Sequence, residues 1–248
     1  MRRYWVEDSA VNDGQVLIEG DTYKHIVGVC RMSEGSHFEV LVSGGKAFFV
    51  EMLDVQKKVA IAKILEERQI PPLRKPFIHL VQSVPKFQVL ENLIEKSVEL
   101  GVYDIHLVTT EYSFMKEKTS VFDKKMDRWN KIVKSSTQQS GRGSLMEIHK
   151  PVSLSEFLKS REFIHHQLPI FAYEGEARSK LHEVFPSDVS DLTDVWVFVG
   201  PEGGFSLDEV QGIRSRGVEP VSLGDQVLRV ETAAVSLIAA VKYQLHLF

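Results

Sequence analysis

Two segments in the last fifth of the sequence combine residue types that bind ligands or move protons. In the first, Phe198–Glu209, an apolar run ends in a turn of Gly200, Pro201, Glu202, Gly203 and Gly204. In the second, Leu223–Val241, a glycine precedes Arg229 and Glu231, which stand at the start of an alanine-rich stretch. Glycines let a ligand approach backbone N–H groups, and paired ionisable groups next to apolar residues are candidates for catalysis.

Each segment also has a purely structural interpretation. The first has neither the Gly-Lys-Ser/Thr ending of a Walker A loop nor the Gly-x-Gly-x-x-Gly of a dinucleotide site, so it predicts no phosphate cradle and is compatible with a simple strand-to-helix turn. Arg229 and Glu231 are equally compatible with a structural ion pair. Ser206 followed by Glu209 is the signature of a capped helix start.

Alternating strands and helices must position these segments. Compact apolar runs predict buried strands, and apolar residues at helical spacing predict helices between them. The strands are expected at Phe77–Val81, Ile105–Val108, Pro169–Tyr173, Val195–Val199 and Val218–Leu223, and the helices at Phe87–Leu100, around Phe122–Val133, from Ser206 to about Arg216 and from about Glu231. This alternation predicts an α/β domain, in which ligands bind where the chain leaves the carboxyl ends of the strands.

The N-terminal part reads as a separate β domain. Short runs at His37–Val42, Lys46–Met52 and Lys58–Leu65 predict strands of a small barrel or sandwich, with a short helix near Asp21–Val27. The charged, proline-containing segment Glu66–Pro76 is predicted to be a linker. We therefore expect two domains, residues 1–70 and 71–248.

Composition restricts the class of protein. Of 248 residues, 43% are hydrophobic, the net charge is −4, and Cys30 is the sole cysteine, which excludes a disordered chain and an internal disulfide framework. The absence of a long apolar run predicts no membrane insertion, and the scattered histidines predict no metal. We expect a cytoplasmic protein. Residues 71–150 hold 13 basic and 9 acidic groups, a local excess that suits contact with phosphates.

The two C-terminal segments together give the sequence a family likeness. The sequence resembles the RsmE family of SPOUT-class RNA methyltransferases in these two motifs. The first is a strand, then Gly-Pro-Glu-Gly-Gly, then a helix; the second, about twenty residues later, is Leu-Gly-Asp-Gln-Val-Leu-Arg-Val-Glu-Thr-Ala. Further matching elements are Arg2-Arg3-Tyr4, His25 with Arg31, Glu95–Val102, Glu111–Ser113, Trp129 and Gln138–Arg142. Tyr112 departs from the arginine usual at its position, and the proline often found after Gly-Arg is missing from Gly143–Glu147.

The resemblance implies an α/β fold with an N-terminal PUA-like, RNA-binding β-barrel and a C-terminal SPOUT methyltransferase domain that contains a trefoil knot. It implies a homodimer that uses S-adenosyl-L-methionine to methylate N3 of a specific uridine in 16S ribosomal RNA of the small ribosomal subunit. The residues implied to bind the cofactor are Tyr173, Val199, Gly200, Pro201, Glu202, Gly203, Gly204, Leu223, Gly224, Val227, Leu228, Arg229 and Thr232.

Methylation at N3 requires removal of the N3 proton, because a neutral imide is a poor nucleophile. Glu231 or Glu202 is the expected base, and Arg229 is expected to stabilise the uracil oxygens. The residues expected to hold the RNA are Arg2, Arg3, His25, Arg31, Lys86 and Arg142.

Two other functions remain open at this point. A SPOUT enzyme acting on another RNA, for example on a transfer-RNA ribose 2′-oxygen, would share the same cofactor residues. A non-catalytic dimeric protein that only binds ribosomal RNA would share the same fold. A nucleotide hydrolase is disfavoured because the sequence lacks the lysine and metal-binding carboxylates that such chemistry uses.

Overall fold

The chain forms two compact units, each with its own sheet and core. The structure is a computed structural model that describes residues 1–116, 119–175 and 179–248. One unit consists of Met1–Pro72 and Lys134–Leu145, and the other of Leu73–Val133 and Met146–Phe248. No helix within the described ranges is long and apolar enough to cross a membrane.

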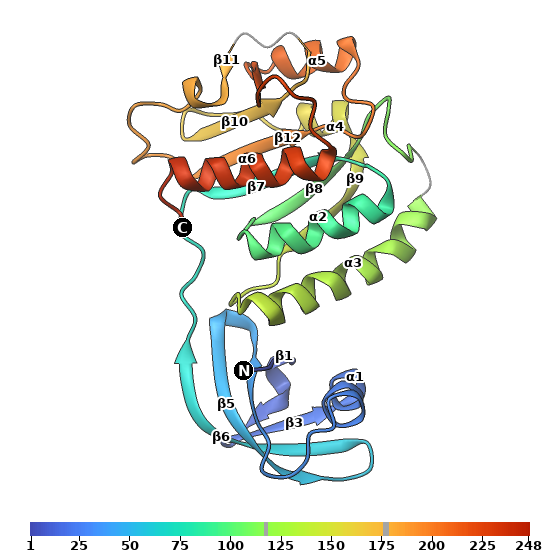
Figure 1. The fold of residues 1–248 in the computed structure, drawn as a ribbon, viewed down its shortest axis with the longest axis vertical. Helices are drawn as coiled ribbons and strands as arrows, with labels where there is room; N and C mark the ends of the chain where they lie inside the picture. The colour runs from blue at the N-terminus through green and yellow to red at the C-terminus, as the bar shows by residue number, and fades with distance from the viewer. Residues whose placement is uncertain (117–118, 176–178) are drawn as a thin grey trace. The chain divides into compact units, whose positions relative to one another are not determined.

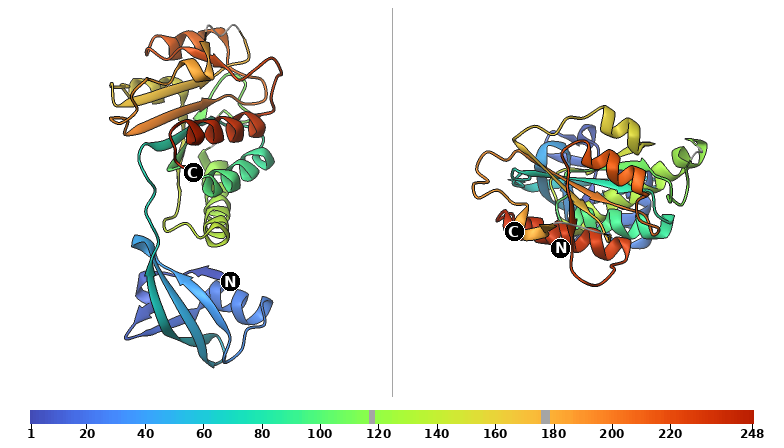
Figure 2. Two further views of the ribbon diagram at one scale, coloured as in Figure 1. Left: turned by 60° about the vertical axis from the view of Figure 1, so that its left-hand side comes forward. Right: turned by 90° about the horizontal axis from the view of Figure 1, so that it is seen from above.

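The first unit contains a six-stranded sheet in the order β1-β4-β5-β6-β3-β2. Only the β1–β4 pair is parallel. The long strands β5 and β6 curl strongly (Figure 2). The strands are β1 (Arg3–Trp5), β2 (Val11–Asn12), β3 (Gln15–Glu19), β4 (His37–Leu41), β5 (Lys46–Val55) and β6 (Val59–Gln69). The helical segments are Asp8–Ala10, α1 (Gly20–Tyr23), a π-helical turn at Lys24–Val29, and Ser43–Gly45.

Alternating apolar side chains of these strands form the core of the first unit. Val16, Ile18, Phe38 and Val50 are almost completely buried. Residues after the predicted boundary also join this unit, because Gln138 Oε1 accepts a hydrogen bond of 2.8 Å from the backbone N–H of Trp5.

The predicted start of the linker was wrong. Glu66–Gln69 continue β6 and pair with Lys46–Phe49 of β5. These four residues contain no proline, so all their N–H groups remain available to the ladder. The first proline, Pro71, comes only after the strand has ended.

The second unit contains a parallel seven-stranded sheet in the order β11-β13-β10-β12-β7-β8-β9 (Figure 1). Its strands are β7 (Phe77–Ser83), β8 (Asp104–Thr109), β9 (Glu147–Ser153), β10 (Gln167–Ala172), β11 (Ser179–Lys180), β12 (Asp194–Val199) and β13 (Pro220–Ser222). Its helices are α2 (Phe87–Glu99), α3 (Thr119–Ser140, which continues into the first unit), α4 (Leu154–Lys159), a turn at Leu181–Glu183, α5 (Leu207–Arg214) and α6 (Val230–Gln244).

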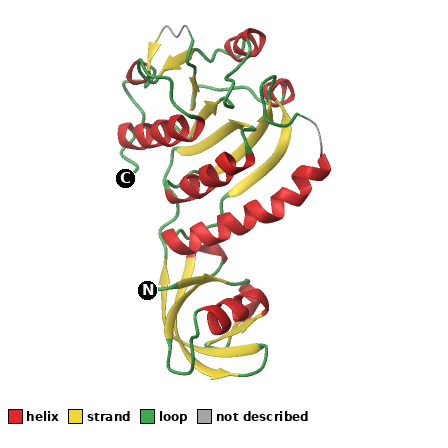
Figure 3. Ribbon diagram, turned by 45° about the vertical axis from the view of Figure 1, so that its right-hand side comes forward, coloured by secondary structure: helices red, strands yellow, loops and turns green. Residues whose placement is uncertain are grey.

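Helices cover both faces of this parallel sheet (Figure 3). Side chains alternate along each strand, so Leu80 and Val197 pack toward α2 and α6, whereas Val81 and Phe198 pack toward α4 and α5. Both faces are apolar, as expected for a buried parallel sheet. The predicted α/β alternation is therefore confirmed, although α3 continues past the expected Val133 to Ser140 and the sequence did not predict β9, α4 or β11.

Candidate functional site

A cavity of about 490 Å³ opens at the carboxyl edge of the parallel sheet. Four chain segments enclose it: the turn after β12, the loop between β13 and α6, the end of β10, and the start of α2. This is the edge at which open α/β sheets bind ligands, and the volume lies in the range of small-molecule sites.

The turn after β12 is held in a shape that glycine makes possible. Gly204 has φ of +70°, and a Cβ there would lie 2.9 Å from Glu174 Oε1. The helix beyond the turn starts as predicted: Glu209 N–H donates to Ser206 Oγ (3.5 Å) and Ser206 N–H donates to Glu209 Oε2 (2.9 Å), which completes the capping box. The turn therefore has a fixed exit into α5.

The second wall is the loop from β13 to α6. Ser222 Oγ accepts a hydrogen bond from Gly224 N–H (3.2 Å), and Gly224 has φ of +125°. Arg229 occupies the N-cap position of α6 without using its side chain as a cap. Its guanidinium remains exposed beside the cavity, and Glu231 follows in the first helical turn.

The two predicted catalytic glutamates, which line the cavity together with Glu174, differ in what they contact. Glu202 Oε1 accepts a hydrogen bond of 3.0 Å from the backbone N–H of Lys86, at the N-cap position of α2. Glu231 is half-buried, and within the described ranges it forms no ion pair with Arg229. The structural ion pair that the sequence left open is therefore absent, and the Glu231 carboxylate forms no hydrogen bond or ion pair with another described residue.

Most of the predicted cofactor residues line this one cavity. The lining includes Tyr173, Val199, Gly200, Pro201, Glu202, Gly204, Leu223, Gly224, Val227, Leu228 and Arg229. Gly203 does not line it; a Cβ at Gly203 would lie 2.8 Å from the Cβ of Tyr112. Thr232 is exposed on α6 and also lies outside the lining. The three predicted catalytic residues, Glu202, Arg229 and Glu231, all line the cavity.

Other lining residues were missed from the sequence. They are Val89, Ala172, Glu174, Phe205, Ser222, Asp225, Gln226, Val230 and Ala233. The position of Ala172 and Glu174 at the carboxyl end of a predicted strand was the available signal for those two.

The predicted RNA-binding residues fall into both units. Lys86 lines the cavity of the second unit, whereas Arg2, Arg3, His25, Arg31 and Arg142 belong to the first. Arg2, His25 and Arg31 are exposed. Arg3 is more constrained, because its Nε lies 2.9 Å from the buried Glu39 carboxylate and its Nη1 donates to Gln139 O at 3.2 Å.

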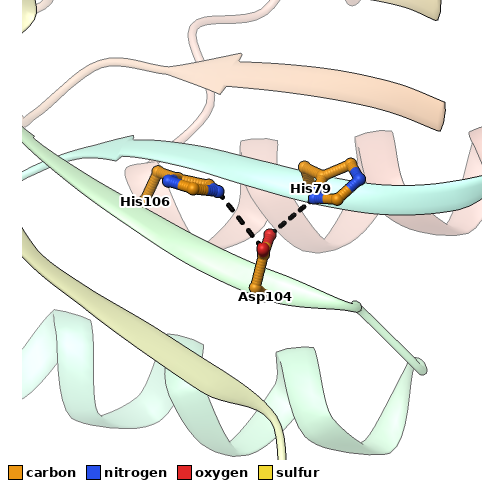
Figure 4. A group of neighbouring side chains, drawn as sticks. All are labelled: His79, Asp104 and His106. Atoms are coloured by element: carbon orange, nitrogen blue, oxygen red, sulfur yellow. Dashed lines mark hydrogen bonds and ion pairs between the residues drawn. The ribbon is translucent and has the colours of Figure 1, made fainter. Parts of the chain in front are cut away.

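A second cluster of ionisable side chains lies at the opposite ends of the strands. Asp104 of β8 accepts a hydrogen bond from His79 Nδ1 (2.7 Å), and His106 Nε2 lies 3.2 Å from its other oxygen (Figure 4). All three are buried, and their donor atoms lie within 4.8 Å of one another. His149 Nε2 is also 3.2 Å from Asp104. Sequence spacing did not reveal this group because His79 and His149 come from the strands on either side of Asp104 and His106.

The ring of His79 is hydrogen-bonded on both sides. Its Nε2 lies 2.9 Å from Asp194 Oδ1, so both nitrogens donate when the ring is an imidazolium. Burial lowers the pKa of His79, but Asp104 and Asp194 outweigh it and raise the pKa above 6.5. Burial raises the pKa of Asp104, but His106 and His79 hold it well below 3.8. Both ring nitrogens of His79 are already engaged by carboxylate oxygens, so neither is available to a metal, and we interpret the cluster as a buried ion network.

Comparison with known proteins identifies the family. A family model for the RNA methyltransferase domain matches residues 73–242, and one for the RNA methyltransferase PUA domain matches residues 18–65. Ribosomal RNA small subunit methyltransferase E of Aquifex aeolicus is 35% identical over 229 residues, which cover 90% of this chain and 92% of that protein. The chain belongs to the ribosomal RNA small subunit methyltransferase E family.

Solved structures agree with this membership. The family member from Neisseria gonorrhoeae, bound to S-adenosyl methionine, has a TM-score of 0.84 at 26% identity and covers 98% of both chains. A putative methyltransferase of Legionella pneumophila, in complex with the cofactor SAM, has a TM-score of 0.86 at 28% identity and covers 98% of this chain and 97% of that one. The predicted family, the mixed α/β fold and the PUA-like N-terminal part are thus confirmed.

Proposed function

We infer that this chain is an S-adenosylmethionine-dependent methyltransferase of small-subunit ribosomal RNA, and we propose that it methylates N3 of a uridine. Family membership carries the inference. The observation that supports it in this chain is the single cavity in which the glycine turn after β12, the loop after β13 and the start of α6 meet.

The residues present suit the cofactor. The cavity combines apolar walls at Val89, Leu223 and Leu228 with glycine-rich backbone. Such a lining buries the adenosine while leaving backbone N–H and C=O groups to contact its polar edges. We propose that the predicted cofactor residues which line the cavity hold S-adenosylmethionine, and that Gly203 contributes by its close packing against Tyr112.

The proposed chemistry assigns a role to each charged group. S-adenosylmethionine supplies an electrophilic methyl group, which the N3 electron pair of uracil takes while the sulfur keeps the electrons of the broken S–C bond. Glu231 accepts the N3 proton, directly or through a water molecule. Arg229 faces the uracil carbonyl oxygens and stabilises the negative charge that develops there as the proton leaves.

We assign Glu202 a different role from the one that its residue type suggested. Its carboxylate already accepts the Lys86 N–H, which makes it a weaker acceptor for a substrate proton and ties the turn after β12 to the start of α2. Glu202 thus positions the cavity wall, and Glu231 is the general base.

RNA recognition follows from the chemistry of the target atom. N3 lies inside a Watson–Crick pair, so the uridine must be unpaired or extruded before it reaches the methyl group. Lys86 lies beside the cavity and is suited to a phosphate near the target. The exposed Arg2, His25 and Arg31 of the first unit are proposed to contact other parts of the RNA backbone.

The finer features of the fold belong to the same proposal. We propose a PUA-like RNA-binding domain over residues 1–70 and a SPOUT domain over residues 71–248, which the family matches at 18–65 and 73–242 support. Likeness to the SPOUT class supports a trefoil knot through the cavity loops, a homodimer, and a cytoplasmic location beside the ribosomal substrate. Light scattering of the purified chain tests the dimer.

Analysis of ribosomal RNA from cells with and without the protein tests the function. We expect one uridine to lose an added methyl group in the deletion strain, and reverse transcription through that site to stop only in the wild type, because an N3 methyl blocks base pairing. A methyl group lost without a change in the stop indicates ribose methylation. Unchanged RNA together with no heat of S-adenosylmethionine binding indicates a non-catalytic RNA-binding protein.

A further inference from the structure

Gln82 is a buried polar residue at the carboxyl end of the central strand β7. Its side chain is completely buried, in register with Val199 at the end of β12. Its amide nitrogen lies 2.8 Å from Ser83 O, 3.3 Å from Val199 O and 3.2 Å from Gly200 O. Val199 and Gly200 line the cavity. One side chain thus contacts the backbone at the point where the cavity turn leaves the sheet.

The hydrogen-bonding chemistry fixes the orientation of this amide. Three carbonyl oxygens surround the position of Nε2, whereas Oε1 has no hydrogen-bond partner among the described residues. Turning the amide over would place its oxygen against three other oxygens, which is strongly unfavourable. The side chain therefore keeps its donors on the turn at the cost of one unpaired acceptor, which is rare in buried sites.

These hydrogen bonds lie where the β7–β12 ladder ends and the cavity turn begins. The ladder between β7 and β12 ends at Gln82 and Val199, so the Gly200 carbonyl lies beyond the last paired residue of β12. Beyond the end of the backbone ladder, the Gln82 amide supplies the next hydrogen bond. It donates to the Gly200 carbonyl, in the first peptide of the turn that runs through Gly204.

We propose that Gln82 is a positioning residue for the cofactor: it holds the Val199–Gly200 backbone in the shape that S-adenosylmethionine binds. The inference rests on the proposed function of the cavity. Gln82 does not line the cavity and touches no substrate atom, so it acts through the turn alone.

Two substitutions and one matched control test the role. Gln82→Met keeps the length of the side chain and removes both donors, and Gln82→Glu keeps its shape and replaces the donors by an acceptor. We expect the KM and Kd for S-adenosylmethionine to rise about fivefold or more in both, because a lost buried hydrogen bond to backbone costs about 1–3 kcal/mol. At saturating cofactor, kcat should change by less than about threefold, since the catalytic groups are untouched.

The control is His79→Gln, which alters the other hydrogen-bonded polar side chain of β7, three positions earlier and also buried. It should lower the melting temperature and leave the KM and Kd for the cofactor unchanged. If the Gln82 variants also melt lower but bind the cofactor like the wild type, Gln82 is merely structural and the inference is wrong.

Hydrogen exchange in the wild-type protein tests the role of Gln82 even if the variants do not fold. In protein labelled with ¹⁵N-glutamine, the Gln82 side-chain amide should exchange its hydrogens slowly, and cofactor should slow the exchange at least severalfold. Rapid exchange that the cofactor does not alter overturns the inference. Wild-type cofactor binding is measured first: failure there refutes the proposed function, whereas binding that the Gln82 variants retain refutes only the role of Gln82.

Discussion

Replacing Asp104 by Asn removes the shared carboxylate of the buried ion network. Asp104 is 6% exposed and accepts the 2.7 Å hydrogen bond of His79. Removing one partner of a buried ion pair typically costs about 3–5 kcal/mol. Asn keeps a carbonyl oxygen that can still accept this bond, so we expect a loss of about 3 kcal/mol. At about 2–4 °C per kcal/mol for a unit of this size, the melting temperature should fall by about 6–12 °C.

The loss of stability caused by Asp104→Asn should depend on pH. The pKa of Asp104 lies below 3.8 in the folded state, so its contribution is present above pH 3.8 and is lost as the pH falls toward the lowered value. The pKa of His79 lies above 6.5, so its contribution is complete below pH 6.5 and is lost as the pH rises through the raised value. The difference between wild type and Asp104→Asn should therefore be largest between pH 3.8 and 6.5.

Calorimetric melting of both proteins at several pH values measures this difference. The matched variant Asp123→Asn alters an exposed carboxylate that pairs with Lys150 at 2.7 Å, and it should change the melting temperature by less than about 2 °C, as expected for surface pairs. A difference for Asp104→Asn that is below about 1 kcal/mol, or that stays constant from pH 4 to pH 9, would refute the ion-network interpretation.

The remaining predictions concern the cavity. Arg229→Ala should lower kcat about a hundredfold or more while changing cofactor Kd less than about threefold, because the guanidinium stabilises charge only during methyl transfer; unchanged turnover in a single-turnover assay contradicts this role. Glu231→Gln should lower kcat similarly, because an amide cannot accept the N3 proton. Glu202→Ala should instead act mainly on cofactor KM, because it removes the oxygen that accepts the Lys86 N–H; a larger loss of kcat for Glu202→Ala than for Glu231→Gln would exchange the two assignments. Gly204→Ala should weaken cofactor binding about fivefold to thirtyfold, since an alanine at φ of +70° costs about 1–2 kcal/mol; calorimetry with the cofactor measures it, and wild-type affinity would show that the turn tolerates a side chain.

The sequence was sufficient for the parts of the site that are local in the chain. Glycines, a capping pair and an acidic first turn each depend on a few consecutive residues, so the turn after β12 and the start of α6 could be predicted. The strands of the parallel sheet were also predictable, because strands buried on both faces are continuous apolar runs.

The parts that depend on strand order could not be predicted. Gln82 and Gly200 are 118 residues apart, and they meet only because β7 lies beside β12. The same holds for His79, Asp104 and Asp194, whose strands adjoin in the order β12-β7-β8. A polar residue at the end of an apolar run gives no sign of its partner until the neighbouring strand is known.

The distribution of the cavity walls along the chain has a consequence for synthesis. The first lining residue is Lys86 and the last is Ala233, in α6, which packs against α2. A nascent chain that does not yet include Ala233 therefore has an incomplete site, however well its earlier strands have paired. The ribosome that translates this protein must therefore deliver α6 before this cavity can form at all.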